Sequence, residues 1–247
     1  MIEKIKRIED EGRAKEVVIF TSVDTWGPQA EYIRTGLEFN RFWDNVNKIL
    51  TECPRVVITF MVTYNALSVF NYEQLIHNVY TLKDQYASTD RYWNSAVFLD
   101  SSYLRYPWHQ AVQVLPMDFS KYILDQAKLI TYYAAPTFSP EHIGYSDVEV
   151  QKVKRIYDWM IAPQDPTQQM KNRYSFYQYF SNHDKRRGTN FVKTFPELEE
   201  FYNIIDSIDE TISSHQYNRY ISDINYLLDG EYYSHEIPTY QIIRADI

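Results

Sequence analysis

Polar residues follow two strand-like segments of this sequence, at positions where ligand contacts are common. Ser22 and Asp24 end the first segment, and Thr63 and Asn65 end the second. Each pair is two positions apart, so in an extended chain its side chains point to the same side. Parallel sheets and barrels bind ligands at the carboxyl ends of their strands. We therefore expect the four side chains to converge on one concave rim, where they could hydrogen-bond a ribose or the amine and carboxylate of an amino acid.

The same residues also allow a purely local role. Asp24 stands before Trp26 and Gly27, where it could form an Asx turn or cap a helix, and Asn65 precedes a possible helix start at Ala66. Spacing alone does not decide between a ligand contact and a turn.

The elements that carry these residues alternate between strands and helices. Strand-like runs span residues 16–22, 55–63 and 92–99, and apolar residues recur at helical spacing in 39–50 and 72–82. This alternation predicts βαβ units with three parallel strands that are neighbours in chain order. Cys53 then lies at the opposite end of the sheet from the polar rim, and we interpret it as a packing residue.

Strand signals nearly disappear after Pro116, and long helical patterns replace them. We predict helices at roughly residues 118–133, 147–161, 171–182 and 196–212, a linker at 162–167, and a final stretch without periodicity at 231–247. Pro196 followed by glutamates suits a helix start. The chain therefore divides into an α/β part, residues 1–116, and a mostly helical extension, residues 117–247.

Several segments resemble the radical S-adenosylmethionine (SAM) enzymes that carry a short C-terminal twitch domain. The strand at 16–22 with the helices that follow it resembles the fourth strand of that barrel and its helices, and Thr59-Phe-Met-Val-Thr-Tyr-Asn65 resembles the fifth strand. The segment Leu99-Asp-Ser-Ser-Tyr-Leu-Arg-Tyr-Pro107, together with residues 112–116, resembles the sixth strand and exit loop of that barrel. Residues 176–202 resemble the C-terminal end of such proteins. The resemblance covers roughly residues 16–202.

This resemblance implies the C-terminal half, strands 4 to 6, of a partial (β/α)6 TIM-like barrel. It implies S-adenosylmethionine and a 4Fe-4S cluster as cofactors of the full-length family, whose reaction is reductive SAM cleavage followed by hydrogen abstraction, here from an unknown substrate. Ser22 and Asp24 would contact the ribose and methionine ends of SAM, and Thr63 and Asn65 the adenosine.

The cysteine count departs from the family pattern. The family holds its cluster on C-x3-C-x2-C after the first strand, whereas this chain has one cysteine, Cys53. One thiolate cannot replace three. We therefore expect no tight cofactor binding and no activity from this chain alone. Either a separate polypeptide supplies the N-terminal half as its partner, or the chain is a fragment from a split or misread gene, and the sequence allows both. Residue 1 would fall in the helix before the fourth strand, which leaves an open sheet edge beside residues 16–22.

Composition excludes several other classes. The net charge of −8 argues against a nucleic-acid partner, and no apolar run approaches a membrane span. A charged N-terminus without a leader and a single cysteine fit a cytoplasmic protein. The six histidines show no metal-binding spacing, so we expect no metal site. We interpret His183-Asp184 with Lys185-Arg-Arg187 as an exposed, salt-bridged loop between helices rather than as an acid–base pair.

Two other functions remain open at this stage. One is a non-catalytic binding or assembly module that keeps the helical C-terminal surface. The other is an unrelated barrel enzyme that uses carboxylates, although its acid–base pair cannot be located without a fold.

Overall fold

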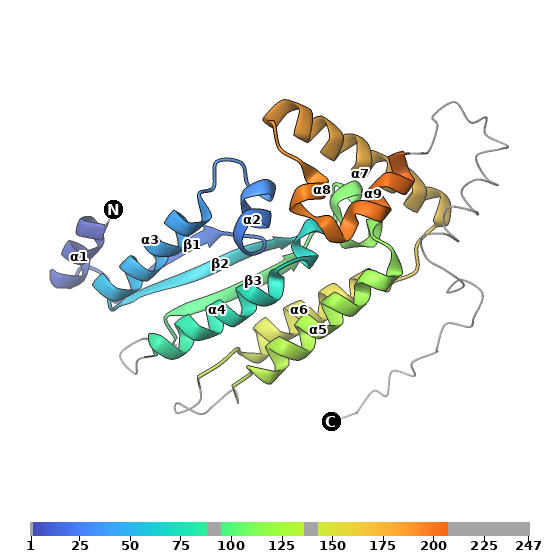
Figure 1. Cartoon of the computed structure of the whole chain (residues 1–247). Coiled ribbons are helices and arrows are strands. Elements are labelled where there is room, and N and C mark those ends of the chain that lie inside the picture. Colours follow the sequence, from blue (N-terminus) through green and yellow to red (C-terminus); the bar gives the residue numbers. More distant parts are fainter. Residues whose placement is uncertain (1, 88–94, 136–142, 207–247) are drawn as a thin grey trace, which may run out of the picture.

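The computed structural model describes residues 2–87, 95–135 and 143–206 as an α/β arrangement with a three-stranded parallel sheet (Figure 1). The strands are β1 (Val17–Ser22), β2 (Val56–Tyr64) and β3 (Val97–Tyr103), in the order β1-β2-β3. Val17 pairs with Val56, and Ile58 pairs with Val97. The prediction of three parallel neighbours in chain order is confirmed. The described strands form an open sheet, so a barrel is not established.

The third strand lies later in the chain than predicted. It was expected at residues 92–99, of which 92–94 lie outside the described residues, but β3 runs from Val97 to Tyr103. The polar residues Asp100, Ser101 and Ser102 resemble a turn in sequence, yet they pair with Met61, Val62 and Thr63 of β2. Partners from two helices make this possible, because Tyr72 hydrogen-bonds Ser101 and Lys152 pairs with Asp100.

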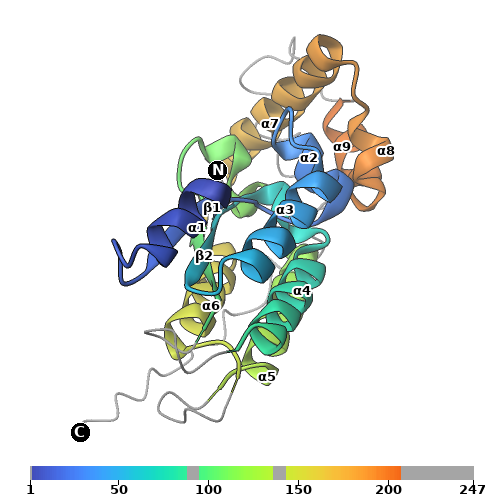
Figure 2. The same cartoon turned by 90° about the vertical axis from the view of Figure 1, so that its left-hand side faces the viewer.

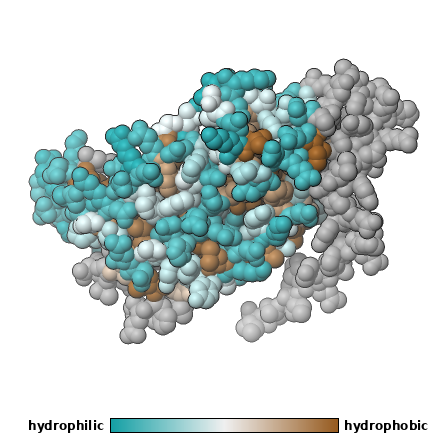
Figure 3. Space-filling model, in the orientation of Figure 1, coloured by the Kyte–Doolittle hydropathy of each residue, from teal (hydrophilic) through white to brown (hydrophobic). Residues whose placement is uncertain are grey.

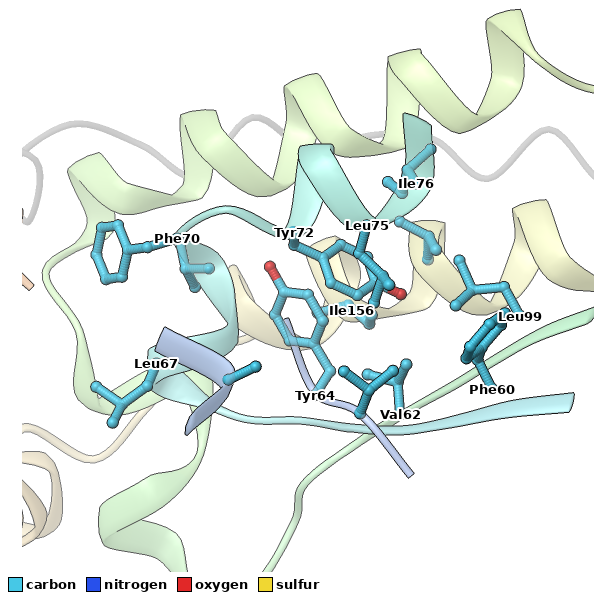
Figure 4. Close-up of a cluster of buried hydrophobic side chains, with 14 of the residues drawn as sticks. Phe60, Val62, Tyr64, Leu67, Phe70, Tyr72, Leu75, Ile76, Leu99 and Ile156 are labelled. Atoms are coloured by element: carbon cyan, nitrogen blue, oxygen red, sulfur yellow. The ribbon is translucent and has the colours of Figure 1, made fainter. Parts of the chain in front are cut away.

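Helices cover one face of the sheet. The crossover helices α3 (Phe39–Glu52) and α4 (Tyr72–Gln85) lie on the same side of it, as the two views of Figures 1 and 2 show. Their buried apolar residues recur at helical spacing, which is why these segments are helical and face the sheet. The core between the layers gathers residues of β2, β3, α4 and α6 (Figure 4), including Phe60, Val62, Tyr64, Tyr72, Leu75, Leu99 and Ile156.

The opposite face of the sheet, called the bare face below, is largely uncovered among the described residues, although Val57 of β2 lies on it and is buried. Val18 and Phe20 of β1 are 42% and 68% exposed, and Met61 of β2 is 36% exposed. By contrast, the view in Figure 3 shows a largely hydrophilic surface with separate small hydrophobic patches. In an open α/β sheet both faces are normally covered. The bare face is therefore the least conventional feature of this fold.

Two short helices flank the sheet. Helix α1 (Ile2–Asp10) packs on α3, and its Glu9 Oε1 accepts a hydrogen bond of 3.0 Å from the amide of Arg55, just before β2. Helix α2 (Gly27–Ile33) follows the β1 loop, and Gly27 has a φ of 63°, which favours glycine.

The second half of the described chain is helical, as predicted. Short 3-10 turns lead from β3 into the helices. The predicted bounds of α5 and α6 agree with the observed ones to within two residues. The elements are 3-10 turns at Trp108–Gln110, Val112–Val114 and Met117–Phe119, α5 (Ser120–Tyr132), α6 (Asp147–Met160), α7 (Pro166–Arg187), α8 (Phe191–Thr194), a 3-10 turn at Pro196–Leu198, and α9 (Glu199–Asp206). Of the predicted helix at 196–212, residues 207–212 lie outside the described part, as does 231–247.

Helix α7 is longer than the predicted 171–182 at both ends. Asp165 caps its start by accepting a hydrogen bond of 2.7 Å from the amide of Gln168, so part of the predicted linker at 162–167 is helical. At the other end Gly188, with a φ of 65°, terminates the helix. The basic residues 185–187 therefore form the last helical turn, where cations interact favourably with the helix dipole, and the predicted loop is wrong.

Candidate functional site at the carboxyl ends of the strands

Asp24 is the central polar residue of this region. Its side chain is buried, and Oδ1 accepts hydrogen bonds from the amide of Thr63 at 2.9 Å and from Arg34 Nη2 at 3.1 Å. Arg34 Nε lies 2.8 Å from Oδ2. Asp24 thus ties the end of β1 to the end of β2 and to the residue that follows α2. Both carboxylate oxygens are engaged within the protein.

Asn65 fills a local capping role. It precedes a 3-10 helix at Ala66–Val69, and its Oδ1 accepts a hydrogen bond of 3.0 Å from the amide of Leu67. Its Nδ2 donates to the carbonyl of Thr63 at 3.1 Å, and its own amide donates to Ser68 Oγ at 3.1 Å. These contacts match the turn-forming alternative for this residue.

Ser22 and Thr63 present exposed hydroxyl groups on the bare face of the sheet. Ser22 pairs with Met61 in the register, and Thr63 pairs with Ser102, which is also exposed. The expected common side for Ser22 and Asp24 does not hold, because the chain leaves the strand after Ser22 and turns Asp24 into the interior. The period-two rule applies only while the backbone stays extended. Ligand binding by Ser22, Asp24, Thr63 and Asn65 stays a prediction.

The loop between β1 and α2 is anchored by further contacts. Thr25 Oγ1 donates to the carbonyl of Phe70, and Gln29 Nε2 donates to the carbonyl of Thr194 at 3.0 Å. Asn71 Nδ2 donates to Gln29 Oε1 at 2.8 Å. Residues far apart in sequence therefore hold this rim together.

Cys53 lies at the amino end of β2, away from this rim. It is fully buried, and its carbonyl accepts a hydrogen bond of 3.1 Å from the amide of Val56. Burial raises the pKa of its thiol, so the thiolate that a metal requires is disfavoured. The expected position of Cys53 at the opposite end from the rim is confirmed.

A buried ion pair joins α4 to α6, and no spacing in the sequence indicates it. Lys83 Nζ lies 3.1 Å from Glu149 Oε1, both side chains are almost fully buried, and burial lowers the pKa of Lys83. Lys83 donates to the carbonyl of Val97 at 2.9 Å, and Glu149 accepts from the amide of Leu99 at 2.8 Å. The pair therefore satisfies two backbone groups on the outer edge of β3, the carbonyl of Val97 and the amide of Leu99. Ser146 and Glu149 form a capping box that is readable in the sequence, but its partner Lys83 is not.

Arg173 on α7 is a second buried cation that sequence reasoning missed. It is completely buried, and its Nε donates to the carbonyl of Val114 at 3.0 Å. Its Nη2 lies 3.5 Å from the carbonyl of Leu115. Arg173 thereby attaches α7 to the turns that follow β3, and no spacing in the sequence reveals this.

His183 is buried and Asp184 is half-buried, and both lie on helix α7 rather than in an exposed loop. Asp184 Oδ1 accepts from the Tyr32 hydroxyl at 2.9 Å, and Oδ2 accepts from the amide of Phe191 at 2.6 Å. His183 is buried against the Tyr32 ring, and burial is the main cause of its lowered pKa. The two residues join α7 to α2 and α8. The prediction of exposure is therefore wrong for His183, whereas residues 185–187 are exposed as predicted.

Among the described residues, no group of three or more His, Cys, Asp and Glu side chains is arranged to hold a metal ion. Within the same ranges no helix has the length and apolar character needed to cross a membrane. Comparisons with family models, curated proteins and solved structures gave no match for this chain.

Proposed function

We propose that this chain is the C-terminal half of a radical SAM barrel, which becomes active only when an N-terminal half supplies the remaining strands and the cluster. The supporting observation is the asymmetry of the sheet: its crossover helices lie on one face, while Phe20 and Met61 stand exposed on the other. A barrel places helices outside and directs the opposite strand face toward its interior. The bare face would then be an interior that further strands enclose.

Within this proposal the exposed hydroxyls and the buried Asp24 have different roles. Ser22 and Thr63 would donate to, or accept from, the ribose of the cofactor, because they lie at the strand ends on the bare face. Asp24 would act as a positioning residue through Arg34 and the Thr63 amide, and Asn65 through its cap. A direct ribose contact from Asp24, as the resemblance implies, would require it to give up one of these partners.

The residues of this chain do not fit an iron–sulfur cluster, because its one thiol is buried at the wrong end of the sheet. Anaerobic reconstitution of the isolated chain with iron and sulfide should therefore leave it colourless. A thiolate-bound cluster would give a broad absorbance at roughly 400 nm. Such an absorbance, if Cys53→Ala removed it, would contradict the expectation of a colourless chain.

The decisive experiment pairs the chain with an N-terminal half. Translation of the DNA upstream of Met1 in all frames would show whether a C-x3-C-x2-C segment exists, and that segment can be co-expressed with the chain. SAM binding measured by calorimetry should appear in the pair and weaken in Thr63→Val and Ser22→Ala. Thr189→Ala, at an exposed residue between α7 and α8, is the control. Unchanged binding in both rim variants would contradict the site.

A non-catalytic assembly module is a second candidate. It is favoured by the internal satisfaction of Asp24 and Asn65, which leaves few polar groups at the rim for a ligand. A pair that forms a stable complex but binds no SAM would support this candidate over the enzyme.

A further inference from the structure

The two edges of the sheet differ in their hydrogen bonding. On β3, the outward amide of Leu99 and the outward carbonyl of Val97 are satisfied by Glu149 and Lys83. On β1, the amide of Val23 points inward to the carbonyl of Met61 at 3.2 Å. The backbone N–H and C=O groups of successive strand residues point to alternate sides. Those of the odd-numbered residues of β1 therefore point to β2, and those of the even-numbered residues point outward. Among the described residues, β1 is therefore the edge strand whose outward groups are left for the addition of another strand.

The free edge of β1 also lacks the features that normally protect an edge. Its sequence, Val17-Val-Ile-Phe-Thr-Ser22, contains no charge and no proline, and it is rich in residues that favour strands. Phe20 extends from it onto the bare face with 68% of its surface exposed. Such an edge is a template for another strand.

We propose that β1 pairs with β1 of a second copy of this chain, antiparallel about a twofold axis beside Phe20. In this register Phe20 lies opposite Phe20 of the second copy, and Val18 lies opposite Ser22. These are the outward-facing positions, so each pair exchanges two backbone hydrogen bonds. The result is a continuous sheet of both copies, closed at its two ends by the Lys83–Glu149 pairs.

The side chains suit this pairing. Two Phe20 rings on the same face, with Cα atoms about 5.5 Å apart in such a pair, can form an aromatic cross-strand contact. The net charge of −8 opposes association. However, none of that charge lies on β1, and physiological salt screens exposed charges beyond about 8 Å. The repulsion therefore acts mainly at long range, where salt weakens it, whereas the contact between the two Phe20 rings is local.

This inference does not rest on the proposed function, although the two occupants compete for the same edge. In the barrel a parallel strand would occupy the position that the second copy occupies here. The oligomeric state is measured on the chain without any cofactor, so a failure of the barrel proposal leaves this test unaffected.

The test is the mass in solution of the full chain by light scattering and sedimentation velocity. We expect a dimer, twice the monomer mass of 29.6 kDa, at micromolar concentration. Phe20→Lys places like charges opposite each other and should raise the dissociation constant by about tenfold or more. Met61→Lys adds the same charge to the same face one strand away from the edge, and it should leave the dimer intact.

Val18→Pro provides the second variant, because it removes an outward donor and no bond to β2. It should also dissociate the dimer while circular dichroism stays unchanged. A monomeric wild type, or a dimer that survives both Phe20→Lys and Val18→Pro, would overturn the proposal. Loss of the dimer in Met61→Lys would also overturn it, because the contact would then be face to face rather than edge to edge.

Discussion

The two edges of the small sheet differ in how their outward backbone hydrogen-bonding groups are covered. Each edge strand has a row of outward backbone donors and acceptors. On β3 this row is covered by α6 and by the buried pair of Lys83 and Glu149. On β1 there is no such cover within the described residues. Covering an edge with buried charges carries a large desolvation cost, and the pair must stay complete. The hydrogen bonding of the covered edge thus depends on one ion pair. The hydrogen bonding of the open edge depends on the strand that pairs with it.

The largest expected effect comes from breaking the covered edge. Glu149→Ala leaves the buried ammonium of Lys83 without its counter-ion and the amide of Leu99 without its acceptor, so the free energy of unfolding should fall by about 3–5 kcal/mol. Urea denaturation followed by circular dichroism measures this. Asp125→Ala, which breaks an exposed pair with Lys128, is the control and should cost about 0–1 kcal/mol. Equal losses in the two variants would mean that the edge of β3 does not need its cover.

A smaller loss is expected at the carboxyl ends of β1 and β2. Asp24→Ala removes the acceptor of the Thr63 amide and of Arg34, which should cost about 1–3 kcal/mol in unfolding free energy. Asp24→Asn retains one acceptor oxygen and should lose less. If Asp24→Ala is as stable as the wild type but abolishes SAM binding in the completed pair, Asp24 contacts the ligand and is not a positioning residue.

Proline substitution compares the inward and outward positions of the open edge. Val18→Pro should change the stability of the monomer by less than about 1 kcal/mol, because edge strands tolerate proline where the amide faces outward. Ile19→Pro removes an inward bond to β2 and should cost about 3 kcal/mol or more. Thermal denaturation at a concentration where both variants are monomeric gives the comparison. Similar losses would show that the outward amide of Val18 is already bonded.

The smallest effect concerns pH and a residue remote from both edges. Burial lowers the pKa of His183 below its ordinary value of 6.5, so the unfolded chain binds the proton more readily than the folded one. Stability should therefore fall as the pH decreases through 6.5 toward the lowered pKa. His183→Gln should flatten this dependence. A wild-type stability that rises on acidification in this range would contradict the burial argument.

Sequence patterns predicted the local elements and their order. Alternating apolar runs and amphipathic spacing located β1, β2, α3 and α4, because burial on one face imposes a period on the chain whatever lies opposite. The same reasoning failed at β3, where Asp100 to Ser102 became strand residues only through Lys152 and Tyr72. It also failed at His183 and Asp184, whose partners come from α2 and α8.

The candidate site shows the same division between local and distant information. The sequence by itself determined that Ser22, Asp24, Thr63 and Asn65 stand at strand ends, that one buried cysteine cannot hold a cluster, and that the strands run parallel in chain order. Only the tertiary structure decided that Asp24 turns inward to Arg34 while the hydroxyls of Ser22 and Thr63 stay exposed. The physical reason is that hydrogen-bond partners of buried polar groups lie tens of residues away, and no local spacing encodes which of them will meet.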